Sequence, residues 1–335
     1  MSDLSGRPLG DTRIDRKLYL PRPEHELLRR SAKQGLNVLL VGERGSGKTT
    51  LLRQLALELR EADIPSLFVD GKLATDAASF LELVRYQLGQ APNLIEAFHE
   101  RYARAFQPRP NLGEATRLLD LIEALRDPTG AQPRTVLLVD GVPSAEAAHT
   151  LFGRLRDELW QLPFNWVIAG DERDRAALLQ PPADAFFDRL VELRPLKPVE
   201  LQGLLKKRLG VRDAQALKPL VEASEGNPRR LLALARDAGE GGRAVEEVLK
   251  ARARREAEAS KLSRPASMLL AELEAVGSAS ASDEDFLRRL GWTRARAVQV
   301  FSELEEVELV ESETEKGPSG RPRKVYRPQG LVEAR

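Results

Sequence analysis

The chain has 335 residues, of which 42% are hydrophobic and 31% charged, a composition that suits two or three globular domains. Its 52 basic and 51 acidic residues nearly cancel, so a nucleic-acid surface must be a local patch, and the absence of cysteine excludes disulfides, thiolate metal sites and a cysteine nucleophile. No apolar run approaches the ~20 residues of a membrane span and the N-terminus has no signal-peptide core, so we expect a cytoplasmic protein without a membrane partner.

The first two thirds of the chain alternate short apolar strands with helices. Strand patterns lie at 37–41, 66–70, 135–140 and 166–170, and leucine stripes of helical spacing begin at 49 and 77. Continuous apolar strands are typical of a parallel sheet buried on both faces. We therefore predict an α/β fold, a parallel sheet covered by helices, in which the stretch 89–133 forms a helical insertion with a Pro-rich turn at 108–110.

The last third has a different pattern. Helical stripes at 198–208, 214–223, 229–237 and 245–260 predict a small all-helical domain, whose highly charged last helix we expect to be solvated. Three helices at 266–276, 283–290 and 293–306 precede two short strands at 308–311 and 324–327, the order of a winged helix-turn-helix. The predicted domains are a core with an N-terminal arm at 1–195, a helical domain at 196–262 and a winged helix at 263–335.

A phosphate-binding motif stands between the first strand and its helix. Residues 42–49 match G-x-x-x-x-G-K-[ST], the P-loop, whose glycines let backbone amides surround phosphate oxygens at a helix N-terminus. The lysine of the motif reaches the β- and γ-phosphates, and its final hydroxyl binds Mg²⁺. A glycine-rich turn with an incidental lysine is the alternative. The predicted ATP-binding residues in this segment are Gly42, Gly45, Ser46, Gly47, Lys48, Thr49 and Thr50.

An acidic metal ligand is expected at the end of another buried strand. The run 136–139 is apolar and ends in Asp140, the pattern of a Walker B strand, so we predict that Thr49 and Asp140 hold Mg²⁺. The alternative role of Asp140 is to cap a strand-to-loop turn. Asp70 also ends a strand, and for this residue we favour the turn interpretation.

Several segments, in order, resemble those of AAA+ ATPases of the initiator and origin-recognition clade and of the related STAND branch. The segment 19–24 resembles the "F-V-G-R-E" box that lies against adenine, 185–193 resembles the box that ends in an arginine finger, and 226–230 resembles the sensor-2 motif. The resemblance implies that Arg22 binds the nucleotide, Arg189 is the finger and Arg229 meets the γ-phosphate. It also makes the domain at 196–262 a lid. The alternatives are surface pairs of Arg189 with Asp188 and of Arg22 with Glu24, and a helix-capping role for Arg229.

The sequence departs from the family pattern where hydrolysis is catalysed. Gly141 follows Asp140 where the family usually has the glutamate that activates water, and the fourth strand ends in 169–172 without the usual sensor-1 side chain. Loss of a general base costs about 10²–10⁴ in rate, so we expect slow or absent ATP hydrolysis, partly rescued by Gly141→Glu. Asp171, Glu172 or Glu146 are the residues that can substitute for the missing base.

The C-terminal domain carries a candidate DNA surface. Its third helix enters the major groove in winged helices, so we predict that Arg294, Arg296 and Gln299 read base edges. The segment 316–327 has five basic residues and no acidic one, and Arg321, Arg323 and Lys324 are predicted to contact phosphates. Seven glutamates between 303 and 315 argue against DNA unless they face away. The alternative is a winged helix that contacts protein.

These features favour an ATP-binding switch that binds duplex DNA through its winged helix and is at most a weak ATPase. One alternative is an active ATPase that loads or remodels other molecules. Another is a STAND-type signalling scaffold in which the winged helix contacts protein. The arginine finger also suggests a homo-oligomer or a partner protein.

Overall fold

The computed structural model describes residues 5–90, 113–126, 134–209, 218–240, 247, 250, 257, 261–316 and 322–328. The chain divides into two compact units. One, here called the core unit, comprises Pro8–Lys207 and Gly226–Pro228. The other, called the C-terminal unit, comprises the described parts of Met1–Arg7, Arg208–Glu225 and Arg229–Arg335.

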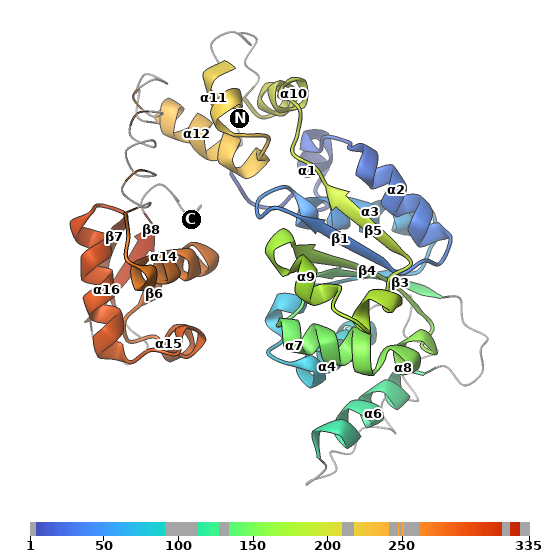
Figure 1. Cartoon of the computed structure of the whole chain (residues 1–335). Helices are drawn as coiled ribbons and strands as arrows, with labels where there is room; N and C mark the ends of the chain where they lie inside the picture. The colour runs from blue at the N-terminus through green and yellow to red at the C-terminus, as the bar shows by residue number, and fades with distance from the viewer. Residues whose placement is uncertain are drawn as a thin grey trace. The chain divides into compact units, whose positions relative to one another are not determined.

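A five-stranded parallel sheet forms the centre of the core unit (Figure 1). Its order is β2-β3-β4-β1-β5, so β1 lies between β4 and β5. The prediction of a parallel α/β sheet is therefore confirmed, but β5 was not predicted as a strand. The strands are β1 (Val38–Gly42), β2 (Ser66–Val69), β3 (Thr135–Asp140), β4 (Phe164–Asp171) and β5 (Arg189–Leu193).

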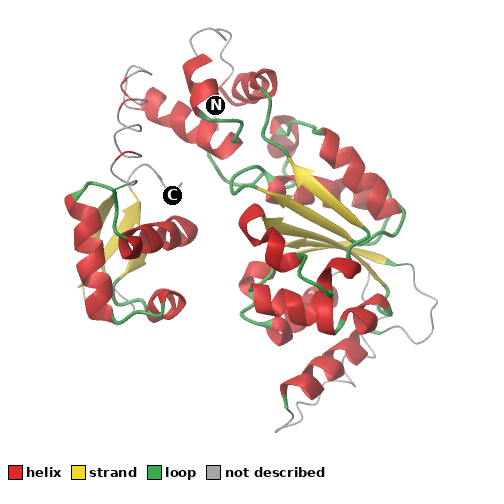
Figure 2. Ribbon diagram, in the orientation of Figure 1, coloured by secondary structure: helices red, strands yellow, loops and turns green. Residues whose placement is uncertain are grey.

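Helices cover both faces of this sheet, as Figure 2 shows. Alternate strand residues point to opposite faces, so Leu39 and Val41 pack with α4 and α6, whereas Val38 and Leu40 pack with α2 and α3. This two-sided burial explains why the strands are apolar throughout. The helices that precede β5 are α1 (Arg13–Leu18), α2 (Pro23–Lys33), α3 (Lys48–Glu61), η1 (Gly71–Leu73), α4 (Ala77–Gln90), α6 (Glu114–Leu125), α7 (Ala145–Ala148), η2 (His149–Arg154), α8 (Arg156–Trp160), η3 (Glu172–Asp174), α9 (Arg175–Leu178) and η4 (Ala183–Phe186).

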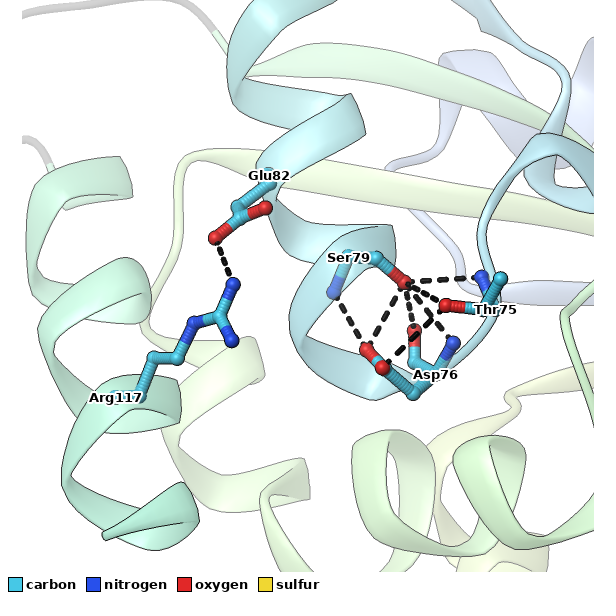
Figure 3. A network of polar contacts seen from close by, with 5 residues as sticks. All are labelled: Thr75, Asp76, Ser79, Glu82 and Arg117. Atoms are coloured by element: carbon cyan, nitrogen blue, oxygen red, sulfur yellow. Dashed lines mark hydrogen bonds and ion pairs between the residues drawn. The ribbon is translucent and has the colours of Figure 1, made fainter. Parts of the chain in front are cut away.

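The predicted helical insertion contains α6, which is joined to α4 by an ion pair. In Figure 3, the Arg117 guanidinium of α6 reaches the Glu82 carboxylate of α4, at 2.5 Å. At the start of α4, the Asp76 side chain accepts a hydrogen bond from the Ser79 amide at 2.8 Å, which satisfies a free amide of the first turn (Figure 3). The remaining parts of the insertion, including the Pro-rich turn at 108–110, lie outside the described residues.

The C-terminal unit begins with helices and ends with a small antiparallel sheet of order β6-β8-β7. The predicted helix at 245–260 lies outside the described residues except at three positions. The short strand β6 was not predicted, and β7 begins two residues later than expected. After α10 (Pro198–Leu209), which starts in the core unit, the elements are α11 (Lys218–Ala223), α12 (Pro228–Glu240), α14 (Arg264–Val276), β6 (Ala279–Ser280), α15 (Glu284–Leu290), α16 (Arg294–Glu306), β7 (Val310–Lys316) and β8 (Pro322–Pro328).

The three helices and three strands at the C-terminal end share one hydrophobic core. Ala297, Val300 and Phe301 on one side of α16 are buried in it. The Phe301 ring stacks on Tyr326 of β8, with the ring centroids 4.0 Å apart. Packing of α16 against the sheet thus fixes which side of the helix stays exposed.

An aromatic cluster holds together one face of the central sheet, and Trp166 of β4 lies at its centre. Trp166 is 1% exposed and contacts the rings of Phe80, Phe152, Phe164 and Phe186. We expect Trp166→Ala to lower the free energy of unfolding by about 3–5 kcal/mol, because the cavity cannot close around a rigid sheet. Circular dichroism during urea unfolding measures this loss.

Two comparisons qualify that measurement. Trp166→Phe should lose less, because the indole nitrogen has no hydrogen-bond partner among the described residues. Tyr86→Ala is the control, since Tyr86 is 60% exposed and its loss should stay within about 0.5 kcal/mol. Equal losses at Trp166 and Tyr86 would contradict this account of the core.

Candidate functional site

The phosphate-loop motif forms the turn between β1 and α3. Gly45 has φ +83° and Gly47, the N-cap of α3, has φ +103°, a backbone region that favours glycine. A Cβ on Gly42 would lie 3.0 Å from Leu193 Cβ and 3.1 Å from Ser46 Oγ, so the loop is closely packed where it leaves the strand. The motif glycines therefore stand where the backbone or the packing requires them.

Lys48 is the first residue of α3, and its side chain folds back over the loop. The ammonium donates hydrogen bonds to the carbonyl oxygens of Gly42 at 2.6 Å and Glu43 at 3.0 Å. The positive charge thus lies at the mouth of the loop and beside the helix N-terminus, both of which favour an anion.

Thr49 and Asp140 are brought together although 91 positions separate them. The Thr49 hydroxyl donates a hydrogen bond of 2.8 Å to Asp140 Oδ2. Asp140 ends β3 and is 3% exposed, and β4 lies between β3 and the strand that carries the loop. A hydroxyl and a carboxylate oxygen are ligands that Mg²⁺ accepts, so this pair fits the predicted metal site.

Lys72 is a site residue that sequence reasoning missed. It lies in η1, which follows β2, and its ammonium is 2.5 Å from the same Asp140 oxygen. No pattern in its own segment marks Lys72; it reaches the site because β2 and β3 are parallel neighbours, so the residues after their carboxyl ends meet at one end of the sheet.

The structure explains why a glycine follows Asp140 at position 141. It has φ +86°, and a Cβ at this position would lie 2.8 Å from Lys72 Cγ. A side chain here meets both backbone strain and the stem of Lys72. The expectation that Gly141→Glu partly rescues hydrolysis is therefore revised, because a glutamate is strained at φ +86° whatever space Lys72 leaves.

The three residues that could replace the missing base, Asp171, Glu172 and Glu146, differ in their positions and contacts. Asp171 ends β4 in register with Gly42, at the edge of the sheet where the loop begins, and its carboxylate accepts a hydrogen bond from the Arg173 amide at 3.1 Å. Glu172 pairs with Arg175 at 3.4 Å, and Glu146 is exposed in α7. Of the three, Asp171 is the one that strand register brings beside Gly42.

Asp174, which was not predicted, adds a second carboxyl group near Asp171. Burial first, and then the charge of Asp171, raise the pKa of Asp174, while the nearby charge of Lys48 opposes the shift. Because Asp171 pairs with Gly42, the turn that holds both acidic residues begins at the end of the sheet where the phosphate loop starts.

Arg22 holds the phosphate loop rather than lying free beside it. Its guanidinium donates hydrogen bonds to the Ser46 carbonyl oxygen at 2.9 Å and to the Arg194 carbonyl oxygen. Glu24 Oε2 is 3.7 Å from Arg22 Nε, so the predicted pair with Glu24 is also present. Burial lowers the pKa of Arg22. The described contacts make Arg22 a residue that positions the loop.

The N-terminal arm lies against α3. Thr50, predicted to bind nucleotide, accepts a hydrogen bond from the Leu9 amide at 3.2 Å, and Gln54 donates one to the Gly10 carbonyl oxygen at 3.0 Å. Leu9 is 3% exposed. The hydroxyl of Thr50 therefore binds the N-terminal arm, a contact that no sequence pattern indicated.

The motif resembling sensor 2 reaches the phosphate loop through its asparagine. Asn227 Nδ2 donates to the Arg44 carbonyl oxygen at 2.8 Å and to Glu43 Oε2 at 3.2 Å. Gly226 has φ +84°, and a Cβ on it would lie 2.4 Å from Pro195 Cβ. Arg229 is exposed in the first turn of α12 and belongs to the C-terminal unit. Asn227 is thus a second residue that sequence reasoning missed.

Arg189 lies at the opposite end of the sheet from the loop. It is the first residue of β5 and pairs with Val38, whereas the loop begins at Gly42, which pairs with Leu193. Four residues of strand correspond to about 13 Å. Arg189 donates a hydrogen bond to Ser31 Oγ at 2.9 Å, and Asp188 accepts one from the Asn37 amide. The alternative surface pair of Arg189 with Asp188 is not among the described contacts. Arg189 lies away from Lys48 and Asp140, the catalytic candidates at the phosphate loop of its own chain.

In the C-terminal unit, the predicted base-reading residues are exposed on α16. Arg294, Arg296 and Gln299 lie outside the buried side of the helix. The Arg296 guanidinium is 3.4 Å from Gln299 Oε1 and lies over the Trp292 ring, 5.9 Å from its centroid. Trp292 itself packs against the hydrophobic core. Weak contacts of this kind leave the three polar side chains available to a ligand.

The predicted phosphate contacts are partly paired with glutamates. Lys324 donates to Glu305 Oε2 at 2.7 Å, and this hydrogen bond raises the pKa of Lys324. Arg327 pairs with Glu313 at 2.8 Å and Glu315 at 2.6 Å. These three glutamates therefore do not face away from the basic residues, as DNA binding was expected to require. Arg323 is half-buried on β8, and Arg321 lies outside the described residues.

Comparisons with known proteins agree with the core of this description. A family model described as an AAA ATPase domain matches residues 25–168, a range that holds the P-loop and Asp140. No curated protein sequence matches the chain. None of the described helices combines the length and apolarity that a bilayer crossing requires.

Solved structures with a similar fold come from archaeal initiators. The ORC2 protein of Aeropyrum pernix, in ADPNP and ADP complexes, is 17% identical with a TM-score of 0.51, over 97% of this chain and 95% of that chain. The A. pernix ORC1 protein in complex with DNA is 18% identical with a TM-score of 0.50, over 92% and 90%. CDC6P of Pyrobaculum aerophilum is 15% identical with a TM-score of 0.50, over the same shares. Residues 25–168 are therefore similar to an AAA ATPase domain, and the fold of the chain is similar to that of archaeal ORC and Cdc6 proteins.

Proposed function

We propose that this protein is a nucleotide-controlled switch that binds ATP with Mg²⁺, hydrolyses it slowly, and binds duplex DNA through a C-terminal winged helix. The observation that carries the nucleotide part is the hydrogen bond from Thr49 to Asp140 beside the phosphate loop. Two distant segments supply the hydroxyl and the carboxylate that a P-loop metal site uses, and they meet at bonding distance.

The residues of the site fit the nucleotide in three respects. Lys48 places an ammonium over the loop, where it suits the β- and γ-phosphates. The Ser46 hydroxyl is buried with no hydrogen-bond partner among the described residues, and a phosphate oxygen would satisfy it. Bound Mg²⁺ would add positive charge between Asp140, Thr49 and the phosphates. The ADPNP and ADP complexes of the ORC2 neighbour are consistent with this proposal.

Slow hydrolysis follows from the surroundings of Asp140. The position after it is a glycine at φ +86°, a backbone conformation that strains a glutamate. The Asp171 carboxylate accepts a hydrogen bond from the Arg173 amide at 3.1 Å, so it caps the turn that follows β4. ATP therefore acts mainly as a bound signal, which distinguishes this proposal from an active loading or remodelling motor.

The remaining domain assignments also belong to the proposal. Residues 1–195 form the ATPase core, 196–262 a lid and 263–335 the winged helix. Arg229 reports the γ-phosphate to the lid, a role that rests on the resemblance of residues 226–230 to the sensor-2 motif. Arg189 acts on the nucleotide of a second copy or a partner protein, because it lies too far along β5 to reach the loop of its own chain.

The DNA part rests on the order of elements and on exposed polar side chains. A helix, a short strand, two helices and an antiparallel strand pair surround one core, with Arg294, Arg296 and Gln299 exposed on the third helix. The ORC1 neighbour was solved in complex with DNA. The glutamate pairs of Lys324 and Arg327 favour a second candidate function, a winged helix that contacts protein as in a STAND-type scaffold.

The first prediction tests nucleotide binding. Lys48→Ala should weaken ATP affinity at least about tenfold, because it removes a charge-assisted bond to phosphate, and should leave thermal unfolding of the apo protein unchanged. Lys33→Ala, at the exposed end of α2, is the matched control. Isothermal titration calorimetry with ATP and Mg²⁺ measures both variants. Equal affinity of wild type and Lys48→Ala would refute the nucleotide assignment.

The second prediction concerns turnover. The wild type should release phosphate well below about 1 s⁻¹, the lower end of ordinary enzyme rates. Gly141→Glu should not raise this rate, because a glutamate at φ +86° strains the turn that follows Asp140. A coupled phosphate assay with Lys48→Ala as the background measures both. Turnover at motor rates would show that another base works in this site and would favour the remodelling alternative.

The third prediction separates DNA binding from protein contact. If Lys324 meets phosphate, Glu305→Gln should bind duplex DNA more tightly, because it releases the ammonium from its ion pair. Glu311→Gln removes the same charge from an exposed position of β7 and is the control. Lys324→Gln should weaken binding and lower the slope of log affinity against log salt by roughly one unit.

Full-length protein, duplex DNA and several salt concentrations suffice for these measurements, with and without ATP. Failure of the wild type to bind duplex DNA at low salt in both states would overturn the DNA part and favour the protein-contact function. Identical curves for Glu305→Gln and Glu311→Gln would remove Lys324 from the phosphate contacts.

A further inference from the structure

The carboxylate predicted to bind Mg²⁺ already carries a cation from its own chain. Asp140 Oδ2 accepts from Thr49 Oγ1 at 2.8 Å and from the Lys72 ammonium at 2.5 Å. The Asp140 side chain is 4% exposed, so its negative charge is shielded from water. A buried carboxylate of this kind needs positive charge or donors close by.

Local structure is shaped to bring Lys72 to this position. The Asp70 side chain accepts from the Lys72 amide at 3.3 Å, which caps η1 at its start. A Cβ on Gly71 would lie 2.1 Å from the Gly141 carbonyl oxygen, so only glycine allows η1 to approach the end of β3 this closely. The absence of a side chain at Gly141 then leaves the path along which the stem of Lys72 runs.

The Lys72 ammonium contacts Asp140, while much of the Lys72 side chain is exposed to solvent. The Lys72 side chain is 57% exposed although its charged end contacts a buried group. A flexible four-carbon stem with this exposure can withdraw into water without disturbing the sheet. A divalent cation can therefore displace it from Asp140.

We propose that Lys72 is a built-in cation that competes with Mg²⁺ for Asp140 and lets the phosphate loop bind nucleotide without metal. This inference rests on the proposed nucleotide function. Without a cation, the charge of Asp140 repels the phosphates beside it, and Lys72 neutralises that charge in the absence of Mg²⁺. Affinity for ATP in the wild type then depends weakly on Mg²⁺.

The test compares ATP affinity in EDTA and in excess Mg²⁺ for the full-length protein. The wild type should change less than about threefold between the two buffers, whereas Lys72→Gln should bind at least about tenfold more weakly in EDTA than in Mg²⁺. Glutamine keeps most of the side-chain length and removes the charge. Lys33→Gln is the control and should behave as the wild type.

A second variant perturbs the Lys72 side chain through a neighbouring residue, Gly141. Gly141→Ala places a methyl group against the Lys72 stem and should shift the Mg²⁺ dependence toward that of Lys72→Gln. Thermal unfolding of each apo variant identifies any that fails to fold, and the other variant then decides.

The outcomes are distinct. Equal Mg²⁺ dependence in Lys72→Gln and wild type would overturn the competition. Weaker ATP binding by Lys72→Gln in both buffers, by equal factors, would also overturn it and would make Lys72 a phosphate ligand instead. A wild type that binds no nucleotide in either buffer would overturn the proposed function and this inference with it.

Discussion

The arrangement of this site depends on a buried carboxylate at the end of β3. Asp140 is nearly inaccessible to water, and an ionised group in such a place must be balanced by donors and cations. Thr49 supplies a hydroxyl from the start of α3, and Lys72 supplies an ammonium from η1. Three segments of the chain therefore converge on one oxygen atom. The glycines at 71 and 141 follow from that convergence, because side chains there would collide with it.

The phosphate loop itself is held from two directions. Arg22 binds the Ser46 carbonyl oxygen, and Asn227 binds the Arg44 carbonyl oxygen. Both use side-chain nitrogens on backbone oxygens, so they fix the path of the loop and leave its amides free of these contacts. Residues that the family resemblance associates with the nucleotide thus act, in the described structure, by positioning the loop that would receive it.

Glutamates neutralise part of the positive charge on the C-terminal unit. Its exposed helix residues are held by weak contacts, whereas the ammonium of Lys324 and the guanidinium of Arg327 lie in ion pairs with glutamates of α16 and β7. Exposed pairs of this kind are worth little in stability, and a ligand with stronger negative charge can break them. Their presence lowers the positive charge that this surface presents, so the proposed DNA binding should depend on salt and on each of these glutamates.

The sequence alone determined the parallel α/β core and its phosphate loop. The strands were recognisable because burial on both faces requires continuous apolar runs, and the loop because few residue types permit its backbone and its charge. Among the described residues of the last third, α10, α11, α12, α14, α15 and α16 overlap the helices that the sequence predicted. These are local properties, and each is visible within about ten neighbouring residues.

Only the tertiary structure decided which distant residues meet. Lys72 is unremarkable in its own segment and becomes part of the site because β2 and β3 are parallel neighbours whose ends coincide. Arg189 fits a motif, yet strand register places it at the opposite edge from Gly42. The glutamates beside Lys324 and Arg327 look like a separate acidic run until the two strands pair. In each case the deciding quantity is a distance across the sheet, and the order of residues along a chain does not contain that distance.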